Sequence, residues 1–250
     1  MRIIISPAKK MRTDEDCFEC SALPSFLPRT EQLLKVLQGM SPKALQQLWK
    51  CNDKIAAQNV DRIRQMDLYS RLTPAILAYD GIQYQHMGPG AFTDEEMAYV
   101  QEHLRILSGF YGAFRPLDGV TPYRLEMQAK LSVNDQKDLY AFWGDSIAQS
   151  LFVETDCILN LASKEYGLCV EKYLPAEKRL ITCIFGVEKN GKVIEKGTLC
   201  KMARGEMVRF LAVRGAESPE EAKNFTALGF RFDPARSDEK TYVFLAGEDA

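Results

Sequence analysis

Short apolar runs rich in β-branched residues alternate with helical patterns along the chain, and this alternation constrains the fold more than any other feature. Arg2–Ile5 is such a run, and the serine and proline that follow it predict its end. Cys157–Leu161 is a further apolar run that predicts a buried strand, and Leu180–Val187 is another predicted strand. The sequence contains no internal repeat and no Gly/Ser linker. We therefore predict an α/β chain of the mixed α+β kind: one compact domain, 1–250, with a central mixed β-sheet surrounded by helices.

A long helix is expected after the first third of the chain. Thr93 and Glu96 have the spacing of a capping box, and apolar residues recur at helical spacing from Met97 to Tyr111. The pattern predicts one continuous helix that Pro116 ends.

Further elements are predicted in the second half. Apolar residues aligned from Asp135 to Leu151 indicate a helix. Asn190-Gly191 is a strong hairpin signal, with Lys192–Cys200 as the second strand. Ala203–Val213 has a helical pattern. Because Arg204 comes just after the predicted strand, one interpretation places its guanidinium at a sheet edge, where anions are commonly recognised.

Charge and cysteine usage limit the possible partners and compartments. The 32 basic and 34 acidic residues nearly cancel, so nucleic-acid binding requires a local basic patch. Seven scattered cysteines, several within apolar runs, suit buried thiols in a reducing compartment. No apolar segment is long enough for a membrane span. We expect a cytoplasmic monomer that does not contact a membrane.

Signals for metals and cofactors are weak. Cys17 and Cys20 have the spacing of half a zinc site, but a second pair is absent and His86 and His103 are the only histidines. The sequence has no GxGxxG or P-loop signature. The sequence therefore predicts neither a metal site nor a cofactor.

Residues 31–54 resemble a helix-hairpin-helix element, in which a tight turn directs backbone N–H groups at a DNA phosphate. An ordinary helix connection with a good N-cap is the alternative. The candidate phosphate-binding residues in this segment are Gly39, Ser41, Lys43, Lys50 and Lys54. A second basic stretch contributes further candidates. They are Lys201, Arg204 and Arg209, together with Lys9 near the N-terminus. For the basic stretch, a solvated helix face is the alternative.

The segment 108–127 combines three glycines and two prolines with charges among aromatic residues. Such charges are expected to be partly buried and paired. The pairs Arg115 with Asp118 and Arg124 with Glu126 are either structural only or part of a polar cleft.

This segment is one of several short motifs that follow one another along the chain. The pieces are Ile5-Ser6-Pro7-Ala8-Lys9, His103-Leu104-Arg105, Leu107-Ser108-Gly109, Tyr111-Gly112, Arg115-Pro116-Leu117-Asp118, Pro122-Tyr123-Arg124-Leu125-Glu126-Met127, Phe142-Trp143-Gly144-Asp145, Asn160-Leu161-Ala162-Ser163, Glu165-Tyr166, Lys201, Ala203-Arg204-Gly205 and Arg209-Phe210. The set covers nearly the whole chain and resembles the YaaA family of peroxide-stress proteins. One departure is Ile82, which stands where the family often has an acid, one position after the glycine that follows Asp80.

The resemblance implies a family-specific fold, a cytosolic role in resisting hydrogen peroxide linked to limiting free iron and oxidative DNA damage, and DNA binding through a helix-hairpin-helix-like element and a positive cleft. Two hypotheses remain open. The first is phosphate-dominated, sequence-independent DNA binding. The second is an enzyme acting on a small anionic substrate in a pocket. That pocket would be lined by Lys9, Arg115, Asp118, Arg124, Glu126 and Arg204. Its candidate bases are Asp118, Glu126 and Asp145. The wider cleft would also include Ser6, Tyr123, Asn160 and Ser163.

Overall fold

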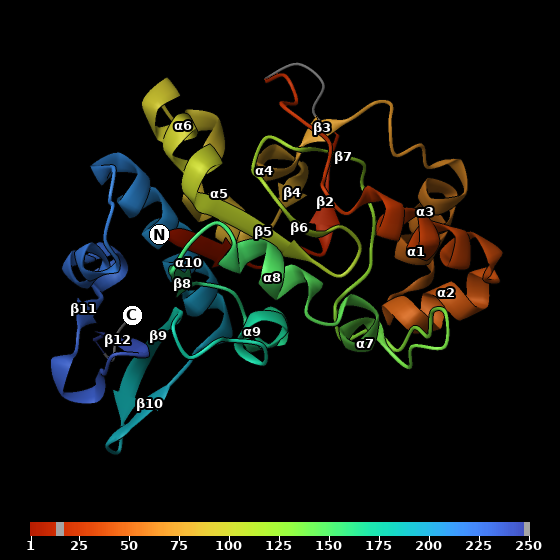
Figure 1. Cartoon of the computed structure of the whole chain (residues 1–250). Helices are drawn as coiled ribbons and strands as arrows, with labels where there is room; N and C mark the ends of the chain where they lie inside the picture. The colour runs from red at the N-terminus through yellow and green to blue at the C-terminus, as the bar shows by residue number, and fades with distance from the viewer. Residues whose placement is uncertain (14–17, 248–250) are drawn as a thin grey trace.

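An eight-stranded sheet forms the centre of the computed structural model, which describes residues 1–13 and 18–247 (Figure 1). Its strands are β1 (Arg2–Ile5), β5 (Leu104–Ser108), β6 (Gly112–Phe114), β8 (Cys157–Asn160), β9 (Arg179–Lys189), β10 (Lys192–Ile194), β11 (Arg231–Phe232) and β12 (Thr241–Ala246). Their order is β11-β12-β9-β8-β1-β5-β6, and β10 pairs with β9. β12, β9, β8, β1 and β5 are parallel, while β6, β10 and β11 are antiparallel to their neighbours. The predicted mixed sheet in a single compact domain is confirmed.

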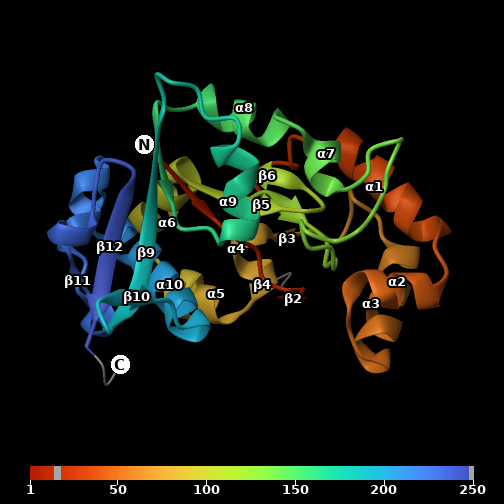
Figure 2. The same ribbon diagram turned by 90° about the horizontal axis from the view of Figure 1, so that it is seen from below.

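Helices cover both faces of this sheet. The helices of the described residues are α1 (Leu27–Gly39), α2 (Pro42–Trp49), α3 (Asp53–Gln65), α4 (Ala75–Ala78), α5 (Ile82–Met87), α6 (Asp94–His103), α7 (Leu139–Trp143), α8 (Ser146–Phe152), α9 (Lys164–Glu171) and α10 (Gly197–Arg214), of which α1, α2 and α3 form a group to one side of the sheet. α8 lies on one side of the strands, while α10 and α5 lie on the other (Figure 2). None of the helices in the described ranges is long and apolar enough to cross a membrane.

Short elements complete the chain. Two-residue strands form two separate antiparallel pairs, β2 (Lys10–Met11) with β4 (Tyr79–Asp80), and β3 (Thr73–Pro74) with β7 (Gly119–Val120). The 3-10 helices are Pro89–Ala91, Pro219–Asn224, Ala227–Gly229 and Pro234–Arg236.

The central position of β1 follows from its composition. Ile3, Ile4 and Ile5 are fully buried, and β1 pairs in parallel with β5 on one side and with β8 on the other. A strand covered on both faces and both edges reads as a continuous apolar run, as this one does. The chain turns at Ser6-Pro7, so the following residues lie at the carboxyl edge of the sheet.

The helix predicted from Thr93 to Tyr111 is wrong in its second half. The capping box at Thr93 is present, but α6 ends at His103, and Leu104–Ser108 forms the buried strand β5. Leu104 and Leu107 fit helical spacing, yet a short apolar run fits a buried strand equally well. Pairing with β1 decides in favour of the strand.

Two other predicted elements change at glycines or sheet ends. The helix expected from Asp135 to Leu151 divides into α7 and α8 at Gly144, whose φ is +54°. The hairpin at Asn190-Gly191 is present, but its second strand ends at Ile194. Arg204 therefore lies inside α10 and not at a sheet edge.

Candidate anion-binding cavity

A cavity of about 470 Å³ lies beyond the carboxyl ends of β1 and β8. The chain leaves β1 towards β5 on one side and later enters β8 on the other, so these two strands mark a topological switch point. Ligand sites of parallel sheets form at such points, outside the carboxyl ends of the strands. The lining residues come from five segments: 6–10, 80–84, 123–126, 163–166 and the α10 pair Lys201 and Arg204.

The loop after β1 is held in place by hydrogen bonds to two helices. The Ser6 hydroxyl accepts a hydrogen bond from the backbone N–H of Ser163 at 2.8 Å and donates to the Ser163 hydroxyl at 3.1 Å. The Tyr84 hydroxyl donates to the Ser6 carbonyl at 3.0 Å. These contacts join the loop to the N-terminus of α9 and to α5, which fixes one wall of the cavity.

Unsatisfied donors concentrate around this cavity. Within the described residues, four buried side-chain nitrogens have no hydrogen-bond partner. Three of them, Gln83 Nε2, Arg124 Nε and Arg204 Nε, belong to residues that line the cavity. A buried donor without a partner costs about 1–3 kcal/mol, so native proteins leave few of them. Three of the four such nitrogens therefore belong to residues that surround one cavity.

Arg124 is only loosely paired. Its Nη1 lies 3.5 Å from the carbonyl oxygen of Lys9, and its Nη2 lies 3.9 Å from Glu126 Oε1. Glu126 makes its closer contact with Lys9, whose Nζ lies 3.0 Å from Oε2. The Arg124 side chain is only 12% exposed. The guanidinium is thus largely withdrawn from water without a bidentate partner, which is its preferred arrangement with carboxylates and phosphates.

Arg204 reaches the cavity because α10 packs unusually closely against α5. A Cβ atom added to Gly205 would lie 2.1 Å from the carbonyl oxygen of Gln83, so only glycine permits this approach. The Arg204 side chain is 13% exposed, and it forms a long ion pair, 3.8 Å from Nη2 to Glu195 Oε2. Arg204 and Gln83 therefore share one wall of the cavity.

Among the carboxyl groups that line the cavity, Glu165 is the one whose pKa is raised. It is half-buried in the first turn of α9, and it accepts a hydrogen bond from the Gln128 N–H at 3.1 Å. Burial raises the pKa of Glu165, and the nearby charge of Glu126 raises this pKa further. A carboxyl group with a raised pKa in a cavity is a candidate for proton transfer.

Tyr123 connects the cavity to the core. Its hydroxyl lies 2.6 Å from Ser108 Oγ and 2.8 Å from the Tyr79 hydroxyl. Ser108 Oγ accepts hydrogen bonds from the backbone N–H groups of Phe110 and Tyr111. Burial raises the pKa of Tyr123. This hydroxyl is engaged internally, so Tyr123 holds the 123–126 segment against β5.

The structure brings together eight of the residues predicted from sequence. Those that line the cavity are Ser6, Lys9, Tyr123, Arg124, Glu126, Ser163, Lys201 and Arg204. Sequence reasoning gave no role to five other lining residues, although two of them appeared in the family motifs. They are Asp80, Gln83, Tyr84, Glu165 and Tyr166.

Arg115 and Asp118 do not line this cavity, which corrects the predicted pocket. They border a separate hollow together with Arg105 and Glu154. Asp118 is buried and accepts a hydrogen bond from the Arg115 N–H at 2.8 Å, so it closes a turn. Burial raises the pKa of Asp118.

Two more predicted residues have structural positions. Asn160 is buried at the end of β8, where Oδ1 accepts from the Ala162 N–H at 2.9 Å and Nδ2 donates to Thr182 Oγ1 at 3.2 Å. Asp145 is exposed at the start of α8. Neither residue lines the cavity.

The basic candidates for DNA do not form one surface. α2 and α10 lie well apart in both views (Figures 1 and 2). Arg209 donates to the carbonyls of Met87 and Gly88 at 3.2 and 3.4 Å, and its guanidinium lies over the Phe92 ring. Arg209 thus packs α10 against the turn after α5.

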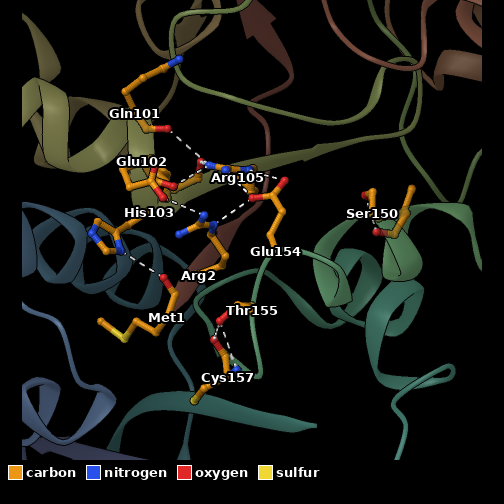
Figure 3. Close-up of polar contacts among 12 residues, drawn as sticks. Met1, Arg2, Gln101, Glu102, His103, Arg105, Ser150, Glu154, Thr155 and Cys157 are labelled. Carbon is orange, nitrogen blue, oxygen red and sulfur yellow. Dashed lines mark hydrogen bonds and ion pairs between the residues drawn. The ribbon is translucent and has the colours of Figure 1, made fainter.

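An ion-pair network that was not predicted from the sequence lies at the starting ends of the parallel strands, opposite the cavity (Figure 3). Glu154 pairs with Arg2, at 2.8 Å from Nε, and with Arg105. Arg105 Nη1 also donates to the carbonyls of Gln101, Glu102 and Leu104. Arg105 is 2% exposed, so this network satisfies a charge inside the fold.

Five thiols of the described residues lie in surroundings that disfavour the thiolate. Burial raises the pKa of all five: Cys20, Cys157, Cys169, Cys183 and Cys200. The thiolate is the reactive form, so a raised pKa lowers reactivity. Cys17 lies outside the described residues. No group of three His, Cys, Asp or Glu side chains in the described ranges could hold a metal ion.

The fold and the cavity together indicate the class of protein: a mixed α/β protein with a ligand-sized cavity at the switch point of a mainly parallel sheet. A family model described as "Peroxide stress protein YaaA" matches residues 1–236. The chain therefore belongs to the peroxide stress protein YaaA family, which confirms the resemblance and supports a role in peroxide stress.

Relatives described as UPF0246 proteins match along the whole chain. The protein of Lachnoclostridium phytofermentans is 53% identical over 99% of this chain and 97% of its own length. That of Agathobacter rectalis is 50% identical over 98% of both chains. That of Ligilactobacillus salivarius is 49% identical over 98% of this chain and 99% of its own.

Proposed function

We propose that the protein binds a small anionic ligand in the cavity at the ends of β1 and β8. The observation that carries the proposal is the group of three buried donors without partners, on Gln83, Arg124 and Arg204. An oxyanion between the two guanidinium groups would give these side chains the acceptors that the protein itself does not supply. The five cationic residues that line the cavity outnumber its three carboxylates, which favours an anion.

The same cavity has the parts of an enzyme. Glu126 is held in ion pairs by Lys9 and Arg124, whereas burial raises the pKa of Glu165. Two carboxyl groups in such different environments can act as an acid and a base. In this proposal Arg124 and Arg204 hold the substrate and Glu165 transfers a proton, a role that the sequence had suggested for Asp118, Glu126 or Asp145.

Anion binding can be tested by calorimetry and thermal unfolding with inorganic phosphate and sulfate. We expect either anion to raise the Tm of the wild-type protein, and Arg204→Gln and Arg124→Gln to weaken binding about tenfold. Arg214→Gln is a matched control, because Arg214 is exposed near the end of the same helix α10. An equal response to anions in wild type and Arg204→Gln would refute the proposal.

DNA binding is a second proposed function, supported by the connection between α1 and α2. Only Met40 and Ser41 join these helices, and the Ser41 side chain accepts from the Ala44 N–H. Lys43, Lys50 and Lys54 are exposed nearby. Gly39 has no neighbour within 4 Å of an added Cβ, which leaves room for a close approach. The hollow between α2 and α3 also contains Asp53 and Asp61, so we place phosphate contact at the turn.

The salt dependence of duplex binding tests this second function. We expect affinity to fall steeply with salt and Lys43→Glu to lower both the affinity and the salt slope, each phosphate contact contributing about one unit of slope. Lys130→Glu is the control, since Lys130 is exposed outside this element. Binding that ignores salt, or that Lys43→Glu leaves unchanged, would contradict this function.

We further propose that the protein acts as a cytoplasmic monomer that limits free iron and oxidative DNA damage, as the family resemblance implies. Complementation of a strain that lacks the protein can separate the two sites. Survival in peroxide and free iron would be measured with Arg204→Gln and with Lys43→Glu. Loss of rescue by one variant alone would assign the role to the cavity or to the hairpin, and full rescue by both would contradict a role for either.

A further inference from the structure

The cavity is much larger than a single oxyanion and is only partly charged. Its volume of about 470 Å³ lies in the range typical of sites for small organic ligands. Apolar or aromatic side chains form much of its wall, among them Ile82, Leu125, Tyr84 and Tyr166. A ligand that fills this space must carry an apolar group as well as an anionic one, because apolar walls are best covered by an apolar partner.

The cationic groups of the cavity come from separate segments. Arg124 belongs to the 123–126 segment and Arg204 to α10, while Lys9 and Lys201 are exposed. The two arginines keep their Nε donors free, and their Nη contacts to carboxylates are long, at 3.9 and 3.8 Å. Guanidinium forks are well matched to phosphate oxygens, and ammonium groups add charge without fixed geometry. This arrangement suits a phosphate ester.

The remaining polar groups call for both hydrogen-bond donors and an acceptor on the ligand. Glu165 and Asp80 offer carboxylate or carboxyl oxygens, and the amide of Gln83 offers an unpaired N–H. Carboxylates recognise sugar hydroxyl groups in nucleotide sites and exocyclic amino groups of bases. A phosphate ester with a flat ring, amino groups or sugar hydroxyls would meet each of these groups.

The position of the cavity agrees with this chemistry. Nucleotides bind at switch points of parallel sheets, and here the segments that follow both strands of the switch point contribute residues to the cavity. The loop after β1 reads Ser6-Pro7-Ala8-Lys9 and lacks the glycines that let backbone amides surround a phosphate. Side chains must therefore hold the phosphate, which is the task that the unpaired donors of Arg124 and Arg204 fit.

We propose that the ligand of this cavity is a nucleoside monophosphate unit, with its phosphate between Arg124 and Arg204 and its base against Ile82 and Leu125. This inference rests on the proposed anion binding and specifies its ligand class. The unit can be a free nucleotide or one nucleotide extruded from a DNA strand, because both present the same phosphate and base.

Calorimetric titrations with the common nucleoside 5′-monophosphates, their nucleosides and inorganic phosphate test the inference. At least one monophosphate should bind about tenfold more tightly than both inorganic phosphate and its own nucleoside. Arg204→Gln should remove most of that advantage, whereas Ile82→Ala should weaken nucleoside and monophosphate alike and leave inorganic phosphate unchanged. Arg204→Lys and the exposed Lys201→Ala serve if Arg204→Gln does not fold, and Arg214→Gln is again the control.

The outcomes separate this inference from the function on which it rests. Phosphate binding with no advantage for any monophosphate would overturn the nucleotide inference and leave anion binding intact. Binding of none of these probes would overturn both. A duplex carrying 2-aminopurine distinguishes the sources: a rise in fluorescence that free monophosphate reverses supports an extruded nucleotide, and no rise together with tight monophosphate binding supports a free one.

Discussion

The edge of the sheet where the parallel strands begin and the edge where they end differ in how fully their arginines are hydrogen-bonded. At the starting edge, Arg105 uses every side-chain nitrogen, with Glu154 and three backbone carbonyls as acceptors (Figure 3). At the carboxyl edge, Arg124 and Arg204 are also largely buried, yet each keeps an Nε–H without a partner. The first edge is complete without a ligand. The second retains hydrogen-bonding capacity, which is the mark of a binding site as opposed to a structural ion pair.

The carboxyl groups show the same contrast. Burial alone would raise the pKa of Glu154, but the hydrogen bonds from Arg105 and Arg2 hold the pKa below its ordinary value. Burial raises the pKa of Glu165, and the neighbouring Glu126 raises it further. One glutamate therefore stabilises the fold as an anion, whereas the surroundings of the other favour its protonated form.

The largest effect on stability is expected when the ion-pair network of Glu154, at the starting ends of the strands, is broken. Glu154→Ala would leave the buried Arg105 without its carboxylate partner, and we expect a loss of about 3–5 kcal/mol in the free energy of unfolding. Glu102→Ala is the control, because Glu102 is 59% exposed and should cost less than about 1 kcal/mol. Chemical denaturation of both variants measures the difference, and similar losses would remove the distinction drawn for this edge.

A substitution in α10 behind the wall of the cavity should lower both stability and anion affinity. Gly205→Ala places a Cβ against the Gln83 carbonyl and forces α10 away from α5, at a cost of about 1–3 kcal/mol in spite of the better helix propensity of alanine. Gly197→Ala is matched to it, since nothing lies within 4 Å of its added Cβ in the same helix. Unchanged anion affinity in Gly205→Ala would show that this packing does not shape the cavity.

Acidity should affect the two edges with opposite signs. The lowered pKa of Glu154 contributes stability above its unfolded value of about 4.5, and this contribution is lost as the pH falls below that value. The raised pKa of Glu165 means that the folded state binds the extra proton, so its stability decreases as the pH rises above about 4.5 towards the raised value.

Urea unfolding across this range can separate these contributions. Glu154→Gln should flatten the loss of stability on the acid side, and Glu165→Gln should flatten the decrease above about pH 4.5. Identical pH profiles of wild type and either variant would contradict the sign assigned to that residue.

The smallest effect on the free energy of unfolding is expected for a substitution in the cavity itself. Arg204→Gln removes a charge that no protein group fully pairs, so the free energy of unfolding should change by about 1 kcal/mol or less, while anion binding weakens. A loss as large as that of Glu154→Ala would place Arg204 among the structural ion pairs.

Local signals in the sequence predicted several elements correctly. β1 and β8 follow from short apolar runs, and the caps at Ser41 and Thr93 follow from their residue types. The strand Leu104–Ser108 was assigned to a helix because apolar periodicity over five residues does not distinguish the two. The decisive information was its pairing with β1, which is a contact across about a hundred residues of chain.

The candidate site divides in the same way. Arg124 and Glu126 were predicted together and do line the cavity, but Arg115 and Asp118 from the same segment, 108–127, lie in a different hollow. Glu165 appeared only as part of a family motif, because neither its burial nor the neighbouring charge of Glu126 is visible in a local pattern.

The amino-acid sequence by itself determined the fold class, the strand β1, the helix caps and the family, because these depend on local composition or on motifs in chain order. Only the tertiary structure decided which charges are satisfied. Arg105, Arg124 and Arg204 are indistinguishable as residues, yet one is saturated and two keep a free donor. That difference depends on which distant carboxylates and carbonyls the sheet topology places within hydrogen-bonding distance.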